Sequence, residues 1–202
     1  VLKSTTGRFG DMRHAYFHED DYCQIEIIPI ENLKFCLEQA GKIAEFSEKH
    51  RNGIGWDKIY LREENPKKIS ELNITIEKIR EAFQEKLPEY DEVYTGYSSE
   101  RILCNNTYAF GVDQGEILFL ETDENGKLTS LWCSEPTTDL YCLPNYERFL
   151  LADWCWEFIC PLADKATIEK YLTERERVFS EITKKWEEQR KKENKKWWKF
   201  WQ

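Results

Sequence analysis

The residues most able to do chemistry lie near the start of the chain, where two histidines stand among carboxylates. His14 and His18 are four residues apart, and on a helix that spacing would place both imidazoles on one face. Imidazole and carboxylate side chains are ligands that zinc and iron sites use. One hypothesis is therefore a metal-dependent hydrolase that uses both histidines and a carboxylate of the same cluster, which contains Asp11, Glu19, Asp20 and Asp21.

Two features of this cluster favour a simpler interpretation. The HExxH pattern of helical zinc sites is absent, and a strand is predicted to begin near Tyr22, which leaves little room for a helix. We therefore expect a solvated acidic loop that leads into a strand, with no metal ion and no cofactor. The sequence also lacks GxSxG and GxGxxG motifs and a glycine-rich phosphate loop. We expect a protein that is not an enzyme.

A second chemically distinctive segment is the tryptophan- and lysine-rich tail. Residues 184–199 contain eight Lys or Arg and three Glu, a surplus of five positive charges in a chain of net charge −9, which leaves about −14 for the rest. Trp186 and Trp197 are 11 residues apart, close to three helical turns, so they would share one face, with Trp201 one turn further. We expect this tail to continue the last helix and to pack on the acidic body. A membrane-surface anchor, stacking on single-stranded nucleic acid and a partner protein are the alternatives.

Periodicity along the chain predicts the elements that would position these groups. Alternation of apolar and polar residues predicts strands, and apolar residues at helical spacing predict amphipathic helices. The predicted strands cover residues 22–28, 58–62, 92–97, 101–112, 116–122 and 127–133. The predicted helices cover residues 33–50, 74–87, 144–160 and 164 onward. Asn125 and Gly126 between two apolar strands predict a hairpin with positive φ at both positions.

This order of elements predicts an α+β fold, in which an antiparallel sheet is covered by helices and a long helix ends the chain. We expect residues 1–163 to form an α+β body. Residues 164–202 are expected to form the C-terminal helix and its basic tail, packed on the same domain.

The composition limits the kinds of partner and compartment. An isoelectric point near 5.1 argues against nucleic acid as a partner of the body and favours a basic protein. No apolar run approaches the roughly 20 residues of a membrane-spanning helix. Seven cysteines without a CxxC pair lie mostly in apolar segments, which is typical of reduced core thiols in a cytoplasmic protein.

The chain resembles a known class of protein at two segments, DDYCQIEIIP (residues 20–29) and GWDKIYLR (residues 55–62). Together with the acidic, Trp- and Cys-rich composition and the KKWWKFW ending, they resemble stand-alone bacterial immunity proteins, which are small cytosolic proteins encoded beside polymorphic toxins. The resemblance implies a non-catalytic inhibitor that binds a toxin domain, such as a basic one. It leaves the toxin's identity and the oligomeric state open.

An immunity protein of this kind would bind its toxin through an acidic face. Many such toxins are nucleases with basic clefts, and an acidic surface could occupy a cleft that is built for phosphates. The candidate contacts are clustered carboxylates near the predicted strand ends, namely Glu19, Asp20, Asp21, Glu121, Asp123 and Glu124.

Overall fold

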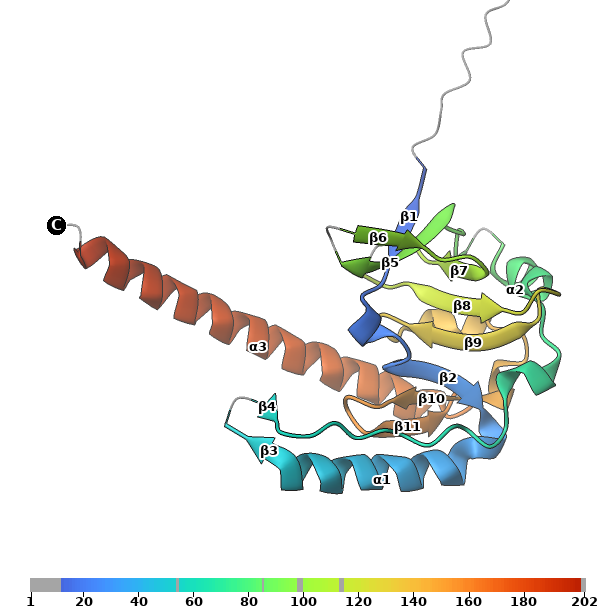
Figure 1. The fold of residues 1–202 in the computed structure, drawn as a ribbon, viewed down its shortest axis with the longest axis horizontal. Helices are drawn as coiled ribbons and strands as arrows, with labels where there is room; N and C mark the ends of the chain where they lie inside the picture. Colours follow the sequence, from blue (N-terminus) through green and yellow to red (C-terminus); the bar gives the residue numbers. More distant parts are fainter. Residues whose placement is uncertain (1–11, 54, 85, 98–99, 113–114, 201–202) are drawn as a thin grey trace, which may run out of the picture. The chain divides into compact units, whose positions relative to one another are not determined.

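The computed structural model describes residues 12–53, 55–84, 86–97, 100–112 and 115–200, with side chains described as far as residue 192 (Figure 1). The chain divides into two compact units, residues 1–163 and 164–202. The first is an α+β unit and the second contains one long helix. The predicted fold class is therefore confirmed.

A six-stranded antiparallel sheet forms the centre of the first unit. Each neighbouring pair of strands runs antiparallel. The strands lie in the order β11 (Phe158–Pro161), β10 (Phe149–Asp153), β2 (Ile25–Pro29), β9 (Leu128–Cys133), β8 (Leu118–Thr122) and β7 (Thr107–Phe110).

Two smaller sheets accompany it. One has the order β1 (His14–Tyr16), β5 (Glu92–Tyr97) and β6 (Glu100–Leu103), and its first pair is parallel. The other joins β3 (Arg51–Asn52) to β4 (Gly55–Trp56). Five short 3-10 helices connect the larger elements of the described chain: η1 (Glu19–Asp21), η2 (Ile30–Asn32), η3 (Ile69–Leu72), η4 (Thr138–Cys142) and η5 (Tyr146–Arg148).

One face of the main sheet is covered at both ends and left open between them. Helix α1 (Leu33–His50) packs over β2 and β10 through a cluster that includes Ile28, Cys36 and Leu150. The three-stranded sheet packs over Phe119 and Trp132. Cross-strand partners share a face of a sheet, and the registers place both covers on the same face. Figure 1 shows α1 along the end of the main sheet that β11 and β10 form, and the three-stranded sheet near β7.

The opposite face receives helix α2 (Ile76–Phe83). Phe83 of this helix meets Phe110 of β7 edge to face, with ring centroids 5.1 Å apart. Phe110 and its cross-strand partner Leu118 lie on the face opposite to Phe119, because successive side chains of a strand alternate. The two covered faces together form the core of the unit.

The hairpin at Asn125 and Gly126 is confirmed, but its turn differs from the one expected. Only Gly126 of this pair has a positive φ, +72°. The Asp123 carboxylate accepts hydrogen bonds from the backbone N–H groups of Asn125 and Lys127, both at 2.9 Å. The ladder of β8 and β9 has a register shift next to this turn, between Glu121 and Thr122. A longer turn that ends on a left-handed glycine explains both observations.

Two predicted elements are wrong. Residues 144–160 form η5 and the hairpin of β10 and β11 rather than a helix. All five side chains of β10 are buried, so this strand lacks the alternation that marks a half-buried strand, and a short apolar run of this kind fits either element. Residues 58–62 form no strand; they follow β4 as irregular chain beside α1.

The second unit is helix α3 (Lys165–Phe200), which confirms the predicted long C-terminal helix. Asp164 caps its start, as predicted, by accepting a hydrogen bond from the backbone N–H of Thr167 at 3.2 Å. Trp186 is 69% exposed. The side chains of Trp197 and Trp201 lie outside the described residues, so the packing of the tail on the body stays a prediction.

Candidate functional site

A cleft opens in the uncovered middle of the sheet, where β2 and β9 separate. The register of these two strands contains a single pair, Glu26 with Trp132. Beyond it, Pro29 has no N–H to donate, and the N–H of Leu128 bonds instead to the carbonyl of Ile74 at 2.9 Å. The resulting cavity has a volume of about 420 Å³, and its lining includes Tyr22, Cys23, Glu26, Arg62, Asn65 and Ser130. We call it the sheet cleft.

Glu26 is the most buried carboxylate of the sheet cleft, with 14% of its side chain exposed. Its Oε2 accepts hydrogen bonds from Arg62 Nη2 at 2.5 Å and from the indole N–H of Trp154 at 2.7 Å. The guanidinium carbon of Arg62 also lies 4.2 Å from the Trp154 ring centroid. Burial raises the pKa of Glu26, although both partners act in the opposite direction. The three side chains form a paired network with no free acid or base.

The two potential nucleophiles of the cleft are kept protonated. Burial raises the pKa of the Tyr22 phenol, which donates a hydrogen bond to Glu121 Oε2 at 2.9 Å. Burial, reinforced by the charge of Glu26, raises the pKa of the Cys23 thiol to about 12. A thiol reacts as its thiolate, so Cys23 is unreactive near neutral pH.

The raised pKa of Cys23 makes stability depend on alkaline pH. Because its folded pKa of about 12 exceeds the ordinary value of 9.0, folding favours the thiol. This contribution is fully present below pH 9 and is lost as the pH rises towards 12. We expect Cys23→Ser, whose hydroxyl does not titrate, to gain about 1–2 kcal/mol relative to the wild type between pH 8 and pH 10.5. Urea unfolding of both proteins at the two pH values measures this; an unchanged difference would contradict it.

Four of the six predicted contact residues lie together at the rim of the sheet cleft. Glu19, Asp20 and Asp21 form η1 and are exposed. Tyr22 follows η1 directly and bonds to Glu121 of β8, which brings this fourth carboxylate to the same rim. We call these four residues the acidic rim.

The other two predicted contacts lie in the turn between β8 and β9. Backbone N–H groups hold the pKa of Asp123 below its usual range, with that of Lys127 the largest cause. Asp123 therefore stabilises the turn, whereas Glu124 beside it is exposed. The structure does not bring these two residues into contact with η1.

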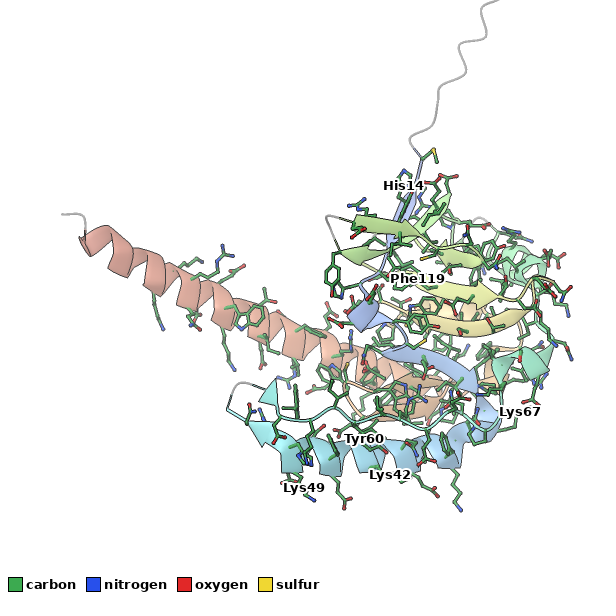
Figure 2. The ribbon with its side chains drawn as sticks, viewed as in Figure 1. His14, Lys42, Lys49, Tyr60, Lys67 and Phe119 are labelled. Atoms are coloured by element: carbon green, nitrogen blue, oxygen red, sulfur yellow. The ribbon has the colours of Figure 1, made fainter. Side chains whose placement is uncertain are left out.

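The histidines have separate partners. His14 Nδ1 lies 3.1 Å from a carboxylate oxygen of Glu92 on β5, and Figure 2 shows His14 on β1. His18 Nδ1 accepts a hydrogen bond from the backbone N–H of Asp20 at 3.2 Å. Within the described residues, no group of three His, Cys, Asp or Glu side chains is arranged to hold a metal ion. Asp11 lies outside the described residues.

A second, more apolar groove lies between α1 and the irregular chain after β4. Its volume is about 860 Å³, and Phe46, Trp56 and Tyr60 are among its lining residues. Figure 2 shows Tyr60 on the segment that runs alongside α1. Trp56 is 61% exposed and Ile59 is 87% exposed. The groove therefore presents aromatic and aliphatic surface to solvent.

The sequence patterns missed Glu26, Arg62 and Trp154. The alternation of residues 22–28 assigned Glu26 to a solvent face, because Cys23, Ile25 and Ile27 occupy the other one. Ile28 was the available signal: an apolar residue on the supposedly polar face indicates that part of this face is also covered.

Comparisons by sequence and by fold return no match to a protein-family model, a curated protein or a solved structure. Among the described helices, none combines the length and the apolar character that a bilayer span requires.

Proposed function

We propose that this protein is a non-catalytic protein-binding module, most specifically an immunity protein that neutralises a cognate toxin through an acidic face. The observation that carries the proposal is the acidic rim. Three carboxylates of η1 are exposed, and Tyr22 holds the fourth, Glu121, beside them. A partner with a basic surface would meet these four carboxylates in one place.

The charge of the first unit supports a basic partner. Residues 1–163 contain 30 Asp or Glu and 17 Lys or Arg, a surplus of 13 negative charges. Such a field accelerates the encounter with a positively charged protein and repels nucleic acid. A nuclease cleft that is built for phosphates would have the required complementary charge.

The interior of the sheet cleft supports a binding role. Glu26 is occupied by Arg62 and Trp154, and the pKa values of Tyr22 and Cys23 are raised by burial. General base and nucleophilic catalysis need a group that is poised to exchange a proton near neutral pH. None of the seven cysteines, all of which lie in the described part of the chain, forms a disulfide bond, which fits a reducing compartment and therefore a cytoplasmic inhibitor.

The test combines the gene's neighbourhood with charge reversal. We expect a large toxin gene directly upstream. We also expect that coexpression of this chain with the toxin domain protects host cells. The variant Glu19→Lys, Asp20→Lys and Asp21→Lys should weaken the complex at least tenfold, because three attractive contacts become repulsive. Calorimetric titration at two salt concentrations measures the affinity. Asp123 is excluded from the variant because it stabilises a turn.

A matched control separates the acidic rim from overall charge. Glu31→Lys, Glu38→Lys and Glu45→Lys changes the net charge equally at exposed positions beside and along α1, and should retain most of the affinity and protection. Equal losses in both variants would contradict a specific acidic face. Absence of an adjacent toxin gene, or of any complex, would contradict the immunity function. A stoichiometric transition metal that is lost on His18→Ala would instead support the metal-dependent hydrolase.

A further inference from the structure

The segment that follows β4 runs along α1 in an extended form. We call residues 57–68 the strap (Figure 1). At one end the Asp57 carboxylate lies 3.0 Å from His50 Nδ1. At the other end the Asn32 side chain bonds to both backbone groups of Lys67, at 2.8 and 2.9 Å. Helix α1, which separates these two attachments, has 18 residues and is about 27 Å long. Ten residues of the strap cover that length at roughly 2.7 Å each, which is close to the rise of a strand.

The side chains of the strap alternate as those of a strand do. Tyr60 donates a hydrogen bond to Gln39 of α1 at 3.2 Å, and Arg62 lines the sheet cleft. Between and before them, Ile59 and Leu61 are 87% and 85% exposed, the two highest values among the large apolar side chains that the structure describes. One side of the strap is therefore anchored to the unit, and the other presents apolar side chains to solvent.

The backbone of the same residues is unpaired. Among the described residues, the N–H and C=O groups of residues 58–62 have no hydrogen-bond partner; the first backbone group held after them is the N–H of Glu63, which bonds to Gln39 at 3.4 Å. The sequence pattern of residues 58–62 predicts a strand, and the structure gives these residues an extended course without a neighbouring strand. An exposed edge of this kind is a template for a strand of another chain.

The charge around the strap differs from that of the acidic rim. Residues 30–68 contain eight basic and seven acidic side chains, whereas the rest of residues 1–163 contains nine basic and 23 acidic ones. The groove between α1 and the strap is lined in part by Phe46 and Trp56. Backbone hydrogen bonds and apolar contacts, rather than opposite charge, are therefore the interactions that this surface can offer to a partner.

We propose that residues 58–62 pair with an extended strand of the protein partner, whose apolar side chains occupy alternate positions and pack against Ile59 and Leu61. The partner strand would supply the backbone hydrogen bonds that these residues lack, and cross-strand apolar pairs would add to them. For the identity of the partner this inference rests on the proposed function, so that the strand belongs to the toxin domain. The strap and the acidic rim border one cleft, because Arg62 and Tyr22 both line it, and one partner can contact both.

Amide hydrogen exchange, resolved by residue with NMR, tests the pairing. In the free full chain we expect the amides of residues 58–62 to exchange fast, since they are unbonded. In the complex with the toxin domain we expect every second one of these amides to slow by at least about a hundredfold, because only alternate N–H groups of a strand point towards a given neighbour. Unchanged exchange in the complex, or equal slowing of all these amides, would overturn strand pairing.

Affinity for the toxin domain provides a second measurement. The variant Ile59→Ala and Leu61→Ala should weaken the complex at least tenfold, because both apolar side chains would be buried by the partner strand. The control Leu37→Ala and Ile102→Ala removes the same two side-chain types at positions that are 53% and 54% exposed and lie outside the strap. The control should bind as the wild type does. Equal affinities of the two variants would overturn the proposal.

These results are distinguishable from those that test the acidic rim. A complex that is weakened by Glu19→Lys, Asp20→Lys and Asp21→Lys but keeps fast exchange at residues 58–62 would overturn the strap pairing and leave the proposed function standing. The reverse pattern would support the strap pairing and contradict the acidic face. Absence of any complex with the toxin domain would overturn both.

Other occupants of the strap would be visible without the toxin domain. Slow exchange at residues 58–62 in the free chain that depends on protein concentration would show that a second copy pairs there. Slow exchange that is lost on truncation after residue 185 would show that the chain's own tail covers the strap. Either result would overturn the proposal.

Discussion

Replacing Glu26 with alanine is expected to lower the free energy of unfolding by about 3 kcal/mol. The substitution leaves the guanidinium of Arg62, with 22% of its side chain exposed, and the indole N–H of Trp154 without their shared acceptor. Arg62 keeps its hydrogen bond to Asn65 Oδ1 at 3.0 Å, but a buried donor that loses a charged acceptor still bears a desolvation cost. Urea unfolding at pH 7 measures the change.

Two variants show whether this loss comes from the network. Glu26→Gln keeps an acceptor oxygen for the same donors and should cost about half as much. Glu63→Gln, which removes a carboxylate whose side chain is 62% exposed and pairs with Lys42, should leave the free energy of unfolding nearly unchanged. Equal destabilisation by all three variants would contradict a specific role for Glu26.

The same network has a pH dependence. Burial raises the pKa of Glu26 above its ordinary 4.5, so folding favours the neutral carboxyl. The stability from this protonation is fully present below pH 4.5 and is lost as the pH rises through the raised folded pKa. Glu26→Gln should abolish this contribution of Glu26 to the pH dependence of the free energy of unfolding.

Replacing Trp132 with alanine is expected to cost about 3–5 kcal/mol. Its side chain is 1% exposed and stacks on Phe119 with ring centroids 5.4 Å apart, while Phe17 and Tyr22 contact it from the covering layer. Removing the indole would leave a cavity between the main sheet and the elements that cover it. Urea unfolding measures the loss, and Trp56→Ala, at a 61% exposed position, should cost less than about 1 kcal/mol.

The phenylalanine variant distinguishes packing from polarity at the same position. The indole N–H of Trp132 is buried and has no hydrogen-bond partner within the described residues. An unsatisfied buried donor costs about 1–3 kcal/mol, and phenylalanine removes it while it retains most of the ring contacts. Trp132→Phe should therefore cost less than half as much as Trp132→Ala. Equal costs would show that the full indole volume determines stability here.

Local patterns were sufficient for most of the elements. Alternation along residues 22–28, helical spacing along residues 33–50 and the cap at Asp164 each predicted an element that the structure contains. These signals depend on neighbours within one or two turns of chain. The same is true of the cluster Glu19–Asp21, which the sequence marked as exposed carboxylates before a strand.

The errors arose where burial removed the pattern. Strand β10 is buried on both faces, so its residues carry no alternation and were assigned to a helix. The element that residues 149–153 form is decided by strands elsewhere in the chain, such as β2, and the residue types of the segment do not indicate them. The contact role predicted for Asp123 stays a prediction, and its carboxylate also accepts hydrogen bonds from two backbone N–H groups of its own turn.

The sequence was enough to establish an acidic α+β chain with a long final helix, because charge and periodicity are properties of short segments. The sheet cleft depended on the tertiary structure. Glu26 is 36 residues from Arg62 and 128 residues from Trp154, and Tyr22 is 99 residues from Glu121. The order and register of the strands bring these residues together. The cleft exists because α1 and the three-stranded sheet cover the two ends of one sheet face and leave its middle open. These are results of packing across the whole unit, and no local pattern encodes them.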